Sequence, residues 1–316
     1  MDKKDFFTRR SVIVCLTMIC CLLWGSAFPC IKIGYRLFGI PSGEASSQIL
    51  FAGERFLIAG ILAAAAGSIS GRRLLFPDRN SLPKVCILSL FQTILQYTFF
   101  YIGLSRTTGM KSSVITASNV FLSILVSVFV FRTEKLTTRK LIGCVLGFSG
   151  VILINLTGDK DLSMSISGEG AVFLSALSYA FSASLTKRFS RNADPVLLSS
   201  WQFIIGGVVM IAAGIVTGGS HSGLTTAGCG MLLYLAFISA AAFSLWSILL
   251  KYNPVSSVSV FGFMNPVFGV ILSALLLSEK SAAGPAQITA ALLLVTAGII
   301  TVNRTTSAKE APAKNG

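Results

Sequence analysis

The stretch LLWGSAFPCIKIGYR at residues 22–36 recurs as LSYAFSASLTKRFSR at residues 177–191, with Trp24 opposite Tyr179 at an offset of 155 residues. Self-similarity over such a separation indicates a chain built from two copies of one structural unit. Further matches have offsets of 145 to 148 residues: 55–56 with 202–203, 101–134 with 246–279, and 150–151 with 298–299.

The composition places these copies in a membrane. Of the 316 residues, 53% are apolar and 12% are charged, whereas soluble domains contain about 25% charged residues. Ten spans of about 20 residues each would use most of the chain and leave no room for a sizeable soluble domain. The net charge of +14 would suggest a nucleic-acid partner, but the basic residues cluster at the ends of apolar runs. We therefore expect a lipid bilayer and no nucleic acid as partner.

Ten helices follow from the uncharged runs. The run 195–250 is too long for one crossing and breaks at the Gly/Ser cluster 217–223. The second helix must extend back across Glu54 and Arg55 to about residue 47. The runs without Asp, Glu, Lys or Arg are 11–31, 56–71, 85–105, 112–131, 141–158, 170–186, 195–250, 252–278 and 281–303.

The two copies are expected to have opposite polarity, because five helices is an odd number. The sequence thus predicts an all-α membrane protein with repeats at 11–158 and 168–303, between tails at 1–10 and 304–316. Inverted repeats are typical of secondary transporters, which hold the substrate near the midplane and alternate its exposure.

Lys and Arg residues predict the orientation. Nineteen lie in the tails and loops on the side of both termini, and six lie on the opposite side. Because basic residues concentrate in cytoplasmic loops, we expect cytoplasmic termini and a plasma-membrane location. A homodimer is compatible with the sequence.

Several of these motifs resemble those of a known family. The WGSAF…K motif of the first helix, the glutamates in FRTEKL and LLSEK, and Asn265-Pro266 are similar to the EamA family, the ten-helix branch of the drug/metabolite transporter superfamily. The resemblance covers about residues 11–303 and implies transport of a small-molecule substrate. Phe121 stands opposite Pro266, where the family often has a proline, so the flexibility of the two halves should differ.

Polar and aromatic residues near the membrane midplane tend to face a cavity. Pro29 and Pro266 each remove one backbone hydrogen bond and should loosen helices one and nine there. The alternative interpretation of the polar side chains is interhelical hydrogen bonding that holds the bundle together. The candidate substrate-binding residues are Trp24, Arg55, Gln92, Gln96, Asn119, Tyr179, Gln202 and Asn265.

Two adjacent charges lie within the second span. Arg55 stays charged at any working pH and could neutralise a substrate carboxylate or phosphate, or form a fixed salt bridge with Glu54. Glu54 is the carboxylate deepest in the predicted bilayer, which makes it the candidate proton carrier.

Charged residues at the helix ends suggest two gates. Lys32 with Glu279 would close the outer side, and Lys187 with Glu134 the inner side, one pair breaking as the other forms. A glutamate at a helix C-terminus calls for a cationic partner. Alternatively, the lysines reach the headgroups and the glutamates pair locally.

No enzyme motif competes with transport. Gly147-Phe148-Ser149-Gly150 resembles a serine-protease motif, but the single histidine, His221, is expected in an outer loop. The seven cysteines read as buried side chains, and no metal or cofactor is expected. The sequence favours export of a small polar or amphipathic metabolite, such as an amino acid. A lipid or lipid-linked sugar flippase and a non-transporting receptor or scaffold are the alternatives.

Overall fold

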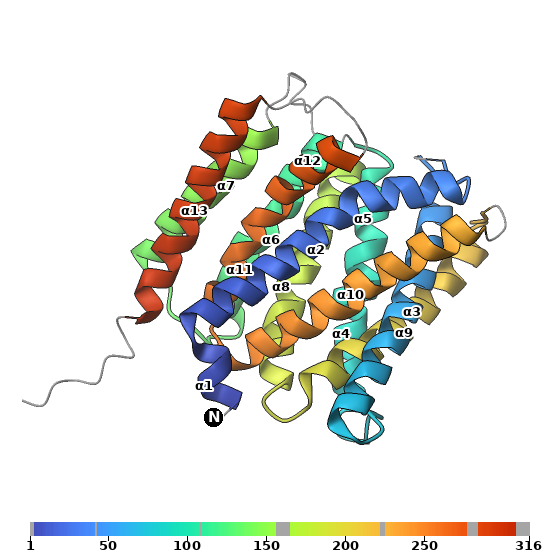
Figure 1. Cartoon of the computed structure of the whole chain (residues 1–316), viewed down its shortest axis with the longest axis horizontal. Coiled ribbons are helices and arrows are strands. Elements are labelled where there is room, and N and C mark those ends of the chain that lie inside the picture. The colour runs from blue at the N-terminus through green and yellow to red at the C-terminus, as the bar shows by residue number, and fades with distance from the viewer. Residues whose placement is uncertain are drawn as a thin grey trace, which may run out of the picture.

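The computed structural model describes residues 3–41, 43–107, 109–155, 165–221, 225–276 and 284–307, and within these ranges all regular secondary structure is helical. Figure 1 shows the helices side by side in one bundle. The first half contains α1 (Lys3–Thr8), α2 (Arg10–Leu37), α3 (Ala45–Gly71), α4 (Leu82–Ser89), η1 (Leu90–Leu95), α5 (Gln96–Leu104), α6 (Gly109–Leu125), η2 (Val126–Val130) and α7 (Thr138–Asn155).

The second half follows the same order. It contains η3 (Ile166–Gly170), α8 (Ala171–Phe189), α9 (Pro195–Val216), α10 (Thr226–Tyr252), α11 (Val255–Ser259), η4 (Val260–Phe263), α12 (Met264–Leu276) and α13 (Pro285–Ser307).

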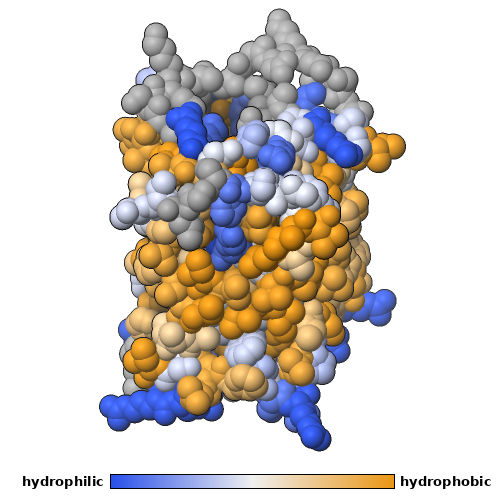
Figure 2. Space-filling view, turned by 90° about the vertical axis from the view of Figure 1, so that its right-hand side faces the viewer, coloured by the Kyte–Doolittle hydropathy of each residue, from blue (hydrophilic) through white to orange (hydrophobic). Residues whose placement is uncertain are grey.

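The bundle has ten crossing segments in the described part of the chain, as the sequence predicted. Nine of them are long and apolar enough to span a membrane by length and composition. The tenth is α8, which is rich in serine and packs between α5, α6 and α10. Because protein rather than lipid surrounds α8, its hydropathy can be lower. Figure 2 shows hydrophilic side chains at both ends of the molecule and a hydrophobic belt between them, as expected of a multi-pass membrane protein.

Helix packing displays the relation between the two repeats. The helices α3 and α9, which are repeat mates, pack along each other, and so do α7 and α13. The first helix of each repeat packs on the other repeat: α2 contacts α10 and α12, and α8 contacts α5 and α6. Two copies exchange contacts in this way when a twofold axis relates them, so the pattern agrees with the inverted repeat.

Glycines allow the repeat mates to approach closely. A Cβ at Gly207 of α9 would lie 2.5 Å from the backbone nitrogen of Leu57 in α3. One residue after the candidate pair Arg55 and Gln202, the rings of Phe56 and Phe203 stack at 5.0 Å, nearly parallel. Small residues at helix crossings are the usual means of packing in membranes. The two repeats therefore meet at the level of Arg55.

Three of the crossing segments are interrupted. The third contains a π-helical segment, η1, and the fourth ends in another, η2. The ninth changes to a 3-10 helix, η4, three residues before Pro266. In contrast, α6 continues through Phe121, and α2 continues through Pro29. Pro266 therefore lies next to a break in its helix, whereas the helix of its repeat mate Phe121 continues without one. Pro29 also lies in an unbroken helix.

We call the end of the bundle where α2 begins and α13 ends the N-terminal face. At this face the short α1 packs on the end of α10, where the ring of Phe7 stacks on Tyr252 at 5.6 Å. The side-chain amide of Asn253 donates a hydrogen bond of 3.0 Å to the Phe7 carbonyl. The chain start is thereby attached to the connection between α10 and α11.

Candidate functional site

Arg55 is a buried charge without a counter-ion. Its side chain, on α3, is 5% exposed, and within the described part of the chain no carboxylate forms an ion pair with it. The guanidinium lies 4.4 Å from the ring centre of Phe56 and 5.9 Å from that of Tyr97. Its Nε has no hydrogen-bond partner among the described residues. A buried charge is normally paired, so Arg55 is available for an anion.

An aromatic row crosses the bundle from Arg55 to Trp24. The rings of Trp24 on α2 and Trp246 on α10 meet edge to face at 4.9 Å. Tyr179 on α8 lies close to Trp246 and to Tyr97, and Tyr97 in turn lies close to Arg55. The repeat mates Trp24 and Tyr179 are thus joined through Trp246. Sequence reasoning missed Trp246 and Tyr97, although Trp246 aligns with Tyr101 in the repeat.

Several buried polar atoms near this row lack a protein partner. Such atoms in a native structure call for a water, an ion or a ligand. They come from both repeats and include five of the predicted site residues. The unpaired atoms, counted over the described residues, include Trp24 Nε1, Arg55 Nε, Gln96 Oε1, Gln202 Nε2 and Asn265 Oδ1.

The candidate amide side chains of Gln92, Gln202 and Asn119 lie in three different surroundings. Gln92 is buried in the π-helical η1, and π segments occur often at functional sites. Gln202, the repeat mate of Arg55, accepts a hydrogen bond from Thr93 of η1. Asn119 is half-buried on α6. Gln202 therefore links α9 to η1 and keeps one free donor.

Glu54 pairs with a histidine that the sequence appeared to place far away. The Nε2 of His221 lies 3.1 Å from Glu54 Oε1, because the loop after α9 folds back over α3. The Ser220 amide donates to Ser47 Oγ at 2.9 Å, and the His221 ring lies on Phe38 at 5.1 Å. His221 therefore lies in the loop after α9, as expected, and contacts Glu54 from there. Glu54 is held by His221, so the Arg55 charge is left without it.

Charged side chains make contacts across the N-terminal face, in a different pairing from the predicted gate. Glu134 forms an ion pair of 2.7 Å with Lys140 and accepts hydrogen bonds from the backbone and hydroxyl of Ser256. Lys187 donates to the carbonyls of Leu250 and Asn253. Glu134 and Lys187 thus hold the same α10–α11 connection without forming an ion pair with each other.

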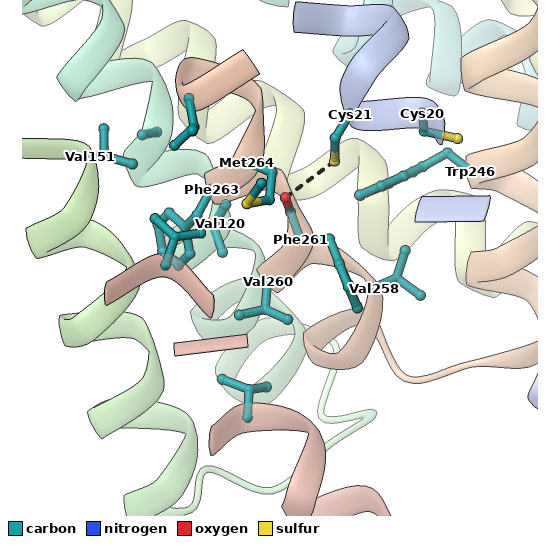
Figure 3. Close-up of a cluster of buried hydrophobic side chains, with 14 of the residues drawn as sticks. Cys20, Cys21, Val120, Val151, Trp246, Val258, Val260, Phe261, Phe263 and Met264 are labelled. Atoms are coloured by element: carbon teal, nitrogen blue, oxygen red, sulfur yellow. Dashed lines mark hydrogen bonds between the residues drawn. The ribbon is translucent and has the colours of Figure 1, made fainter. Parts of the chain in front are cut away.

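An apolar cluster continues from these contacts toward the aromatic row. In Figure 3, Cys21 of α2 points at the main chain of η4, and the Cys21 thiol donates to the Phe261 carbonyl at 3.2 Å. Phe261, Phe263 and Val260 are buried in the same cluster as Trp246. The break in the ninth crossing segment therefore lies directly between the row and the N-terminal face.

We expect Glu134→Gln to destabilise the protein. The paired side chains are 9% and 7% exposed, and removing one partner of a buried pair costs about 3–5 kcal/mol because the other charge is left uncompensated. Glu134→Gln combined with Lys140→Met should recover most of the loss, and Lys135→Met at an exposed position should have little effect. Thermal unfolding in detergent measures all three. Equal midpoints for Glu134→Gln and wild type would contradict a stabilising pair.

The opposite face contains a carboxylate that sequence reasoning overlooked. Glu169 of η3 accepts hydrogen bonds from Thr107 and from the Ser165 amide, and lies 3.7 Å from Lys111. These hydrogen bonds stabilise the carboxylate and lower the pKa of the Glu169 carboxyl to about 2, with the larger effect from Thr107 and the next from the Ser165 amide. Of the predicted outer gate, Lys32 is exposed on α2 and Glu279 lies outside the described residues.

Comparisons with known proteins agree with this architecture. A solved crystal structure superimposes with a TM-score of 0.77 over 96% of this chain and 100% of its own, at 18% identity, which shows a common fold. An uncharacterized transporter of Archaeoglobus fulgidus is 27% identical, with 86% of this chain and 91% of the relative covered. The uncharacterized transporter YvbV of Bacillus subtilis is 26% identical over 97% and 95%.

A third relative is the chloroplastic WAT1-related protein At3g02690 of Arabidopsis thaliana, 26% identical over 81% of this chain and 61% of its own length. The model of the EamA-like transporter family matches residues 11–156 and 166–304, which is most of the chain and both repeats. Ten crossing segments, two copies of five and a polar centre between them are features of a transporter. The chain belongs to the EamA-like transporter family.

Proposed function

We propose that this protein exports a small polar or amphipathic metabolite, such as an amino acid, by alternating access across the plasma membrane with both termini in the cytoplasm. The observation that carries the proposal is the set of buried polar atoms without a partner, drawn from both repeats, together with the buried Arg55, which has no ion pair among the described residues. Substrates of secondary transporters bind at the repeat interface near the midplane. The stacked Phe56 and Phe203 rings put Arg55 at that interface.

The chemistry of the site favours a carboxylate next to an apolar or aromatic group. A guanidinium can hold a carboxylate with two parallel hydrogen bonds, and in this protein no internal acid competes for it among the described residues. The row from Tyr97 to Trp24 offers ring faces for the remainder of the molecule. Asn265 and Gln96 contribute free carbonyl oxygens that can accept from an amino group.

We take this conformation to be closed at the N-terminal face, because Glu134 and Lys187 both hold the α10–α11 connection. Opening that face requires the α10–α11 connection to leave Glu134 and Lys187, and η4 with Pro266 is the break that can hinge there. A direct Lys187–Glu134 contact and the Lys32–Glu279 contact remain proposals for other steps of the cycle. We assign Glu54 as the proton carrier, with His221 as its partner in the closed state.

Metabolite profiling of cells tests the function. Cells expressing wild type should release a compound that cells with the Trp24→Ala, Asn265→Ala double variant release at least about tenfold less, since about 1.4 kcal/mol of lost binding is a factor of ten. Trp201→Ala is the matched control, because Trp201 hydrogen-bonds Leu75 far from the row. Equal release by the wild type and the folded double variant would contradict this site and favour a lipid substrate or a non-transporting role.

A further inference from the structure

A cavity that does not include the aromatic row lies at the N-terminal face. It measures about 300 Å³ and is bordered by α2, α13, η4 and the α10–α11 connection. Neither Trp24 nor Arg55 contributes to its wall. The lining residues are Thr8, Arg10, Ile13, Val14, Met18, Tyr252, Asn253, Pro254, Ser257, Phe261, Met264, Thr296, Ile299, Ile300 and Asn303. We call this cavity the Arg10 groove.

The Arg10 groove changes from polar to apolar with depth. Arg10 is the first residue of α2, and Met18 lies eight residues further along that helix, about 12 Å deeper at 1.5 Å per residue. On α13, Asn303 lies near the N-terminal face and Ile299 one turn deeper. The polar end therefore lies level with the lipid headgroups and the apolar end level with the acyl chains.

The wall of the Arg10 groove contains a basic residue and no acidic one. Arg10 is the single charged residue among the lining residues, and none of them is acidic. Lys251 adds a second cation beside the wall, with its Nζ 5.6 Å from the ring centre of Tyr252. Of the residues before α2, only Thr8 lines the groove, and it is uncharged. The polar end of the groove thus complements an anion.

We propose that the Arg10 groove binds one anionic phospholipid from the leaflet at the N-terminal face, with its phosphate at Arg10 and an acyl chain along Ile13, Met18 and Ile299. Basic pockets between transmembrane helices are known sites for anionic lipid headgroups, and burial of an acyl chain along apolar side chains adds to the affinity.

The bound lipid would stabilise the closed N-terminal face. Asn253, Ser257 and Phe261 line the groove and belong to the segment that must move for opening. A ligand that binds one conformation raises the population of that conformation. The lipid site does not depend on the identity of the transported compound, so it goes beyond the proposed function.

The test uses purified full-length protein stripped of lipid and titrated with phosphatidylglycerol or phosphatidylcholine, with thermal unfolding and native mass spectrometry as readouts. Phosphatidylglycerol should raise the unfolding midpoint of wild type and of Arg9→Gln, and should bind Arg10→Gln at least about fivefold more weakly. Arg9 is exposed, next to Arg10 and outside the groove. Met18→Trp should fill the groove and block binding, whereas Leu22→Trp, on the exposed surface of α2, should not.

Three results would overturn the proposal. One is equal affinity for the two lipids, and another is an equal effect of Arg9→Gln and Arg10→Gln, since either would show a general attraction to the membrane surface. The third is binding that requires removal of residues 308–316, since the C-terminal tail would then be the native occupant.

Discussion

Arg55→Gln is expected to abolish export while leaving the protein folded. Arg55 is buried and has neither an ion pair nor a partner for its Nε in the described part of the chain. Its removal eliminates a desolvated charge, so stability should be unchanged or higher. Each hydrogen bond to a charged group contributes about 1.5–3 kcal/mol, and the guanidinium would supply two of them to a carboxylate, so the apparent affinity for such a substrate should fall by about 150-fold or more and export should become undetectable. Glutamine already occupies the equivalent position of the second repeat, Gln202.

Two further variants separate charge from geometry. Arg55→Lys keeps the charge but loses the planar fork that binds a carboxylate through two bonds, so it should retain weak transport. Arg72→Gln changes an exposed arginine at the end of the same helix and should transport normally. Rates are compared at matched protein levels in the membrane. Normal affinity in Arg55→Gln would show that the guanidinium does not contact the substrate.

Gly207→Ala is expected to disrupt the interface between the repeats. The added Cβ would lie 2.5 Å from the Leu57 nitrogen and 2.8 Å from the Gly53 carbonyl oxygen. Both are backbone atoms of α3, so no side chain can turn away and the two helices must separate. Overpacking costs about 1–3 kcal/mol, occasionally more, and we expect the upper end of that range. The unfolding midpoint in detergent and the yield of monodisperse protein should both fall.

Gly230→Ala is the matched control for that substitution. Gly230 lies on α10 with no atom within 4 Å of the Cβ position, so alanine should be neutral or stabilising by up to about 1 kcal/mol through helix propensity. If Gly207→Ala and Gly230→Ala unfold at the same temperature, the close contact of α3 with α9 is not important for stability.

The sequence alone predicted the helix bundle and its internal repeat. The helices follow from local composition, and the repeat follows from comparing the sequence with itself. Uncharged runs give the crossing segments, and an odd number of helices per copy gives the inversion. Even the serine-rich α8 was found, since its likeness to the first helix does not depend on hydropathy. Trp24, Tyr179 and Arg55 could be proposed as central residues because polar or aromatic side chains are rare at that depth.

Pairings between side chains could not be found in the same way. The partner of Glu54 comes from a loop 167 residues further along the chain, and its approach depends on how the loop folds. Glu134 pairs with Lys140, six residues away and already within α7, so the contact depends on how the short connection before α7 folds. The periodicity of apolar residues along a helix does not predict either of these side-chain contacts. Trp246 could have been found by its repeat mate Tyr101.

Flux in proteoliposomes tests the central claim most directly: that the two repeats enclose an Arg55-anchored site for a small solute. The compound identified by metabolite profiling is loaded on one side, and its movement is followed with and without a pH gradient. The account predicts saturable flux for wild type and Arg72→Gln, and none above empty liposomes for Arg55→Gln. Wild-type protein that is folded and moves no solute, or that scrambles labelled lipid instead, would contradict it.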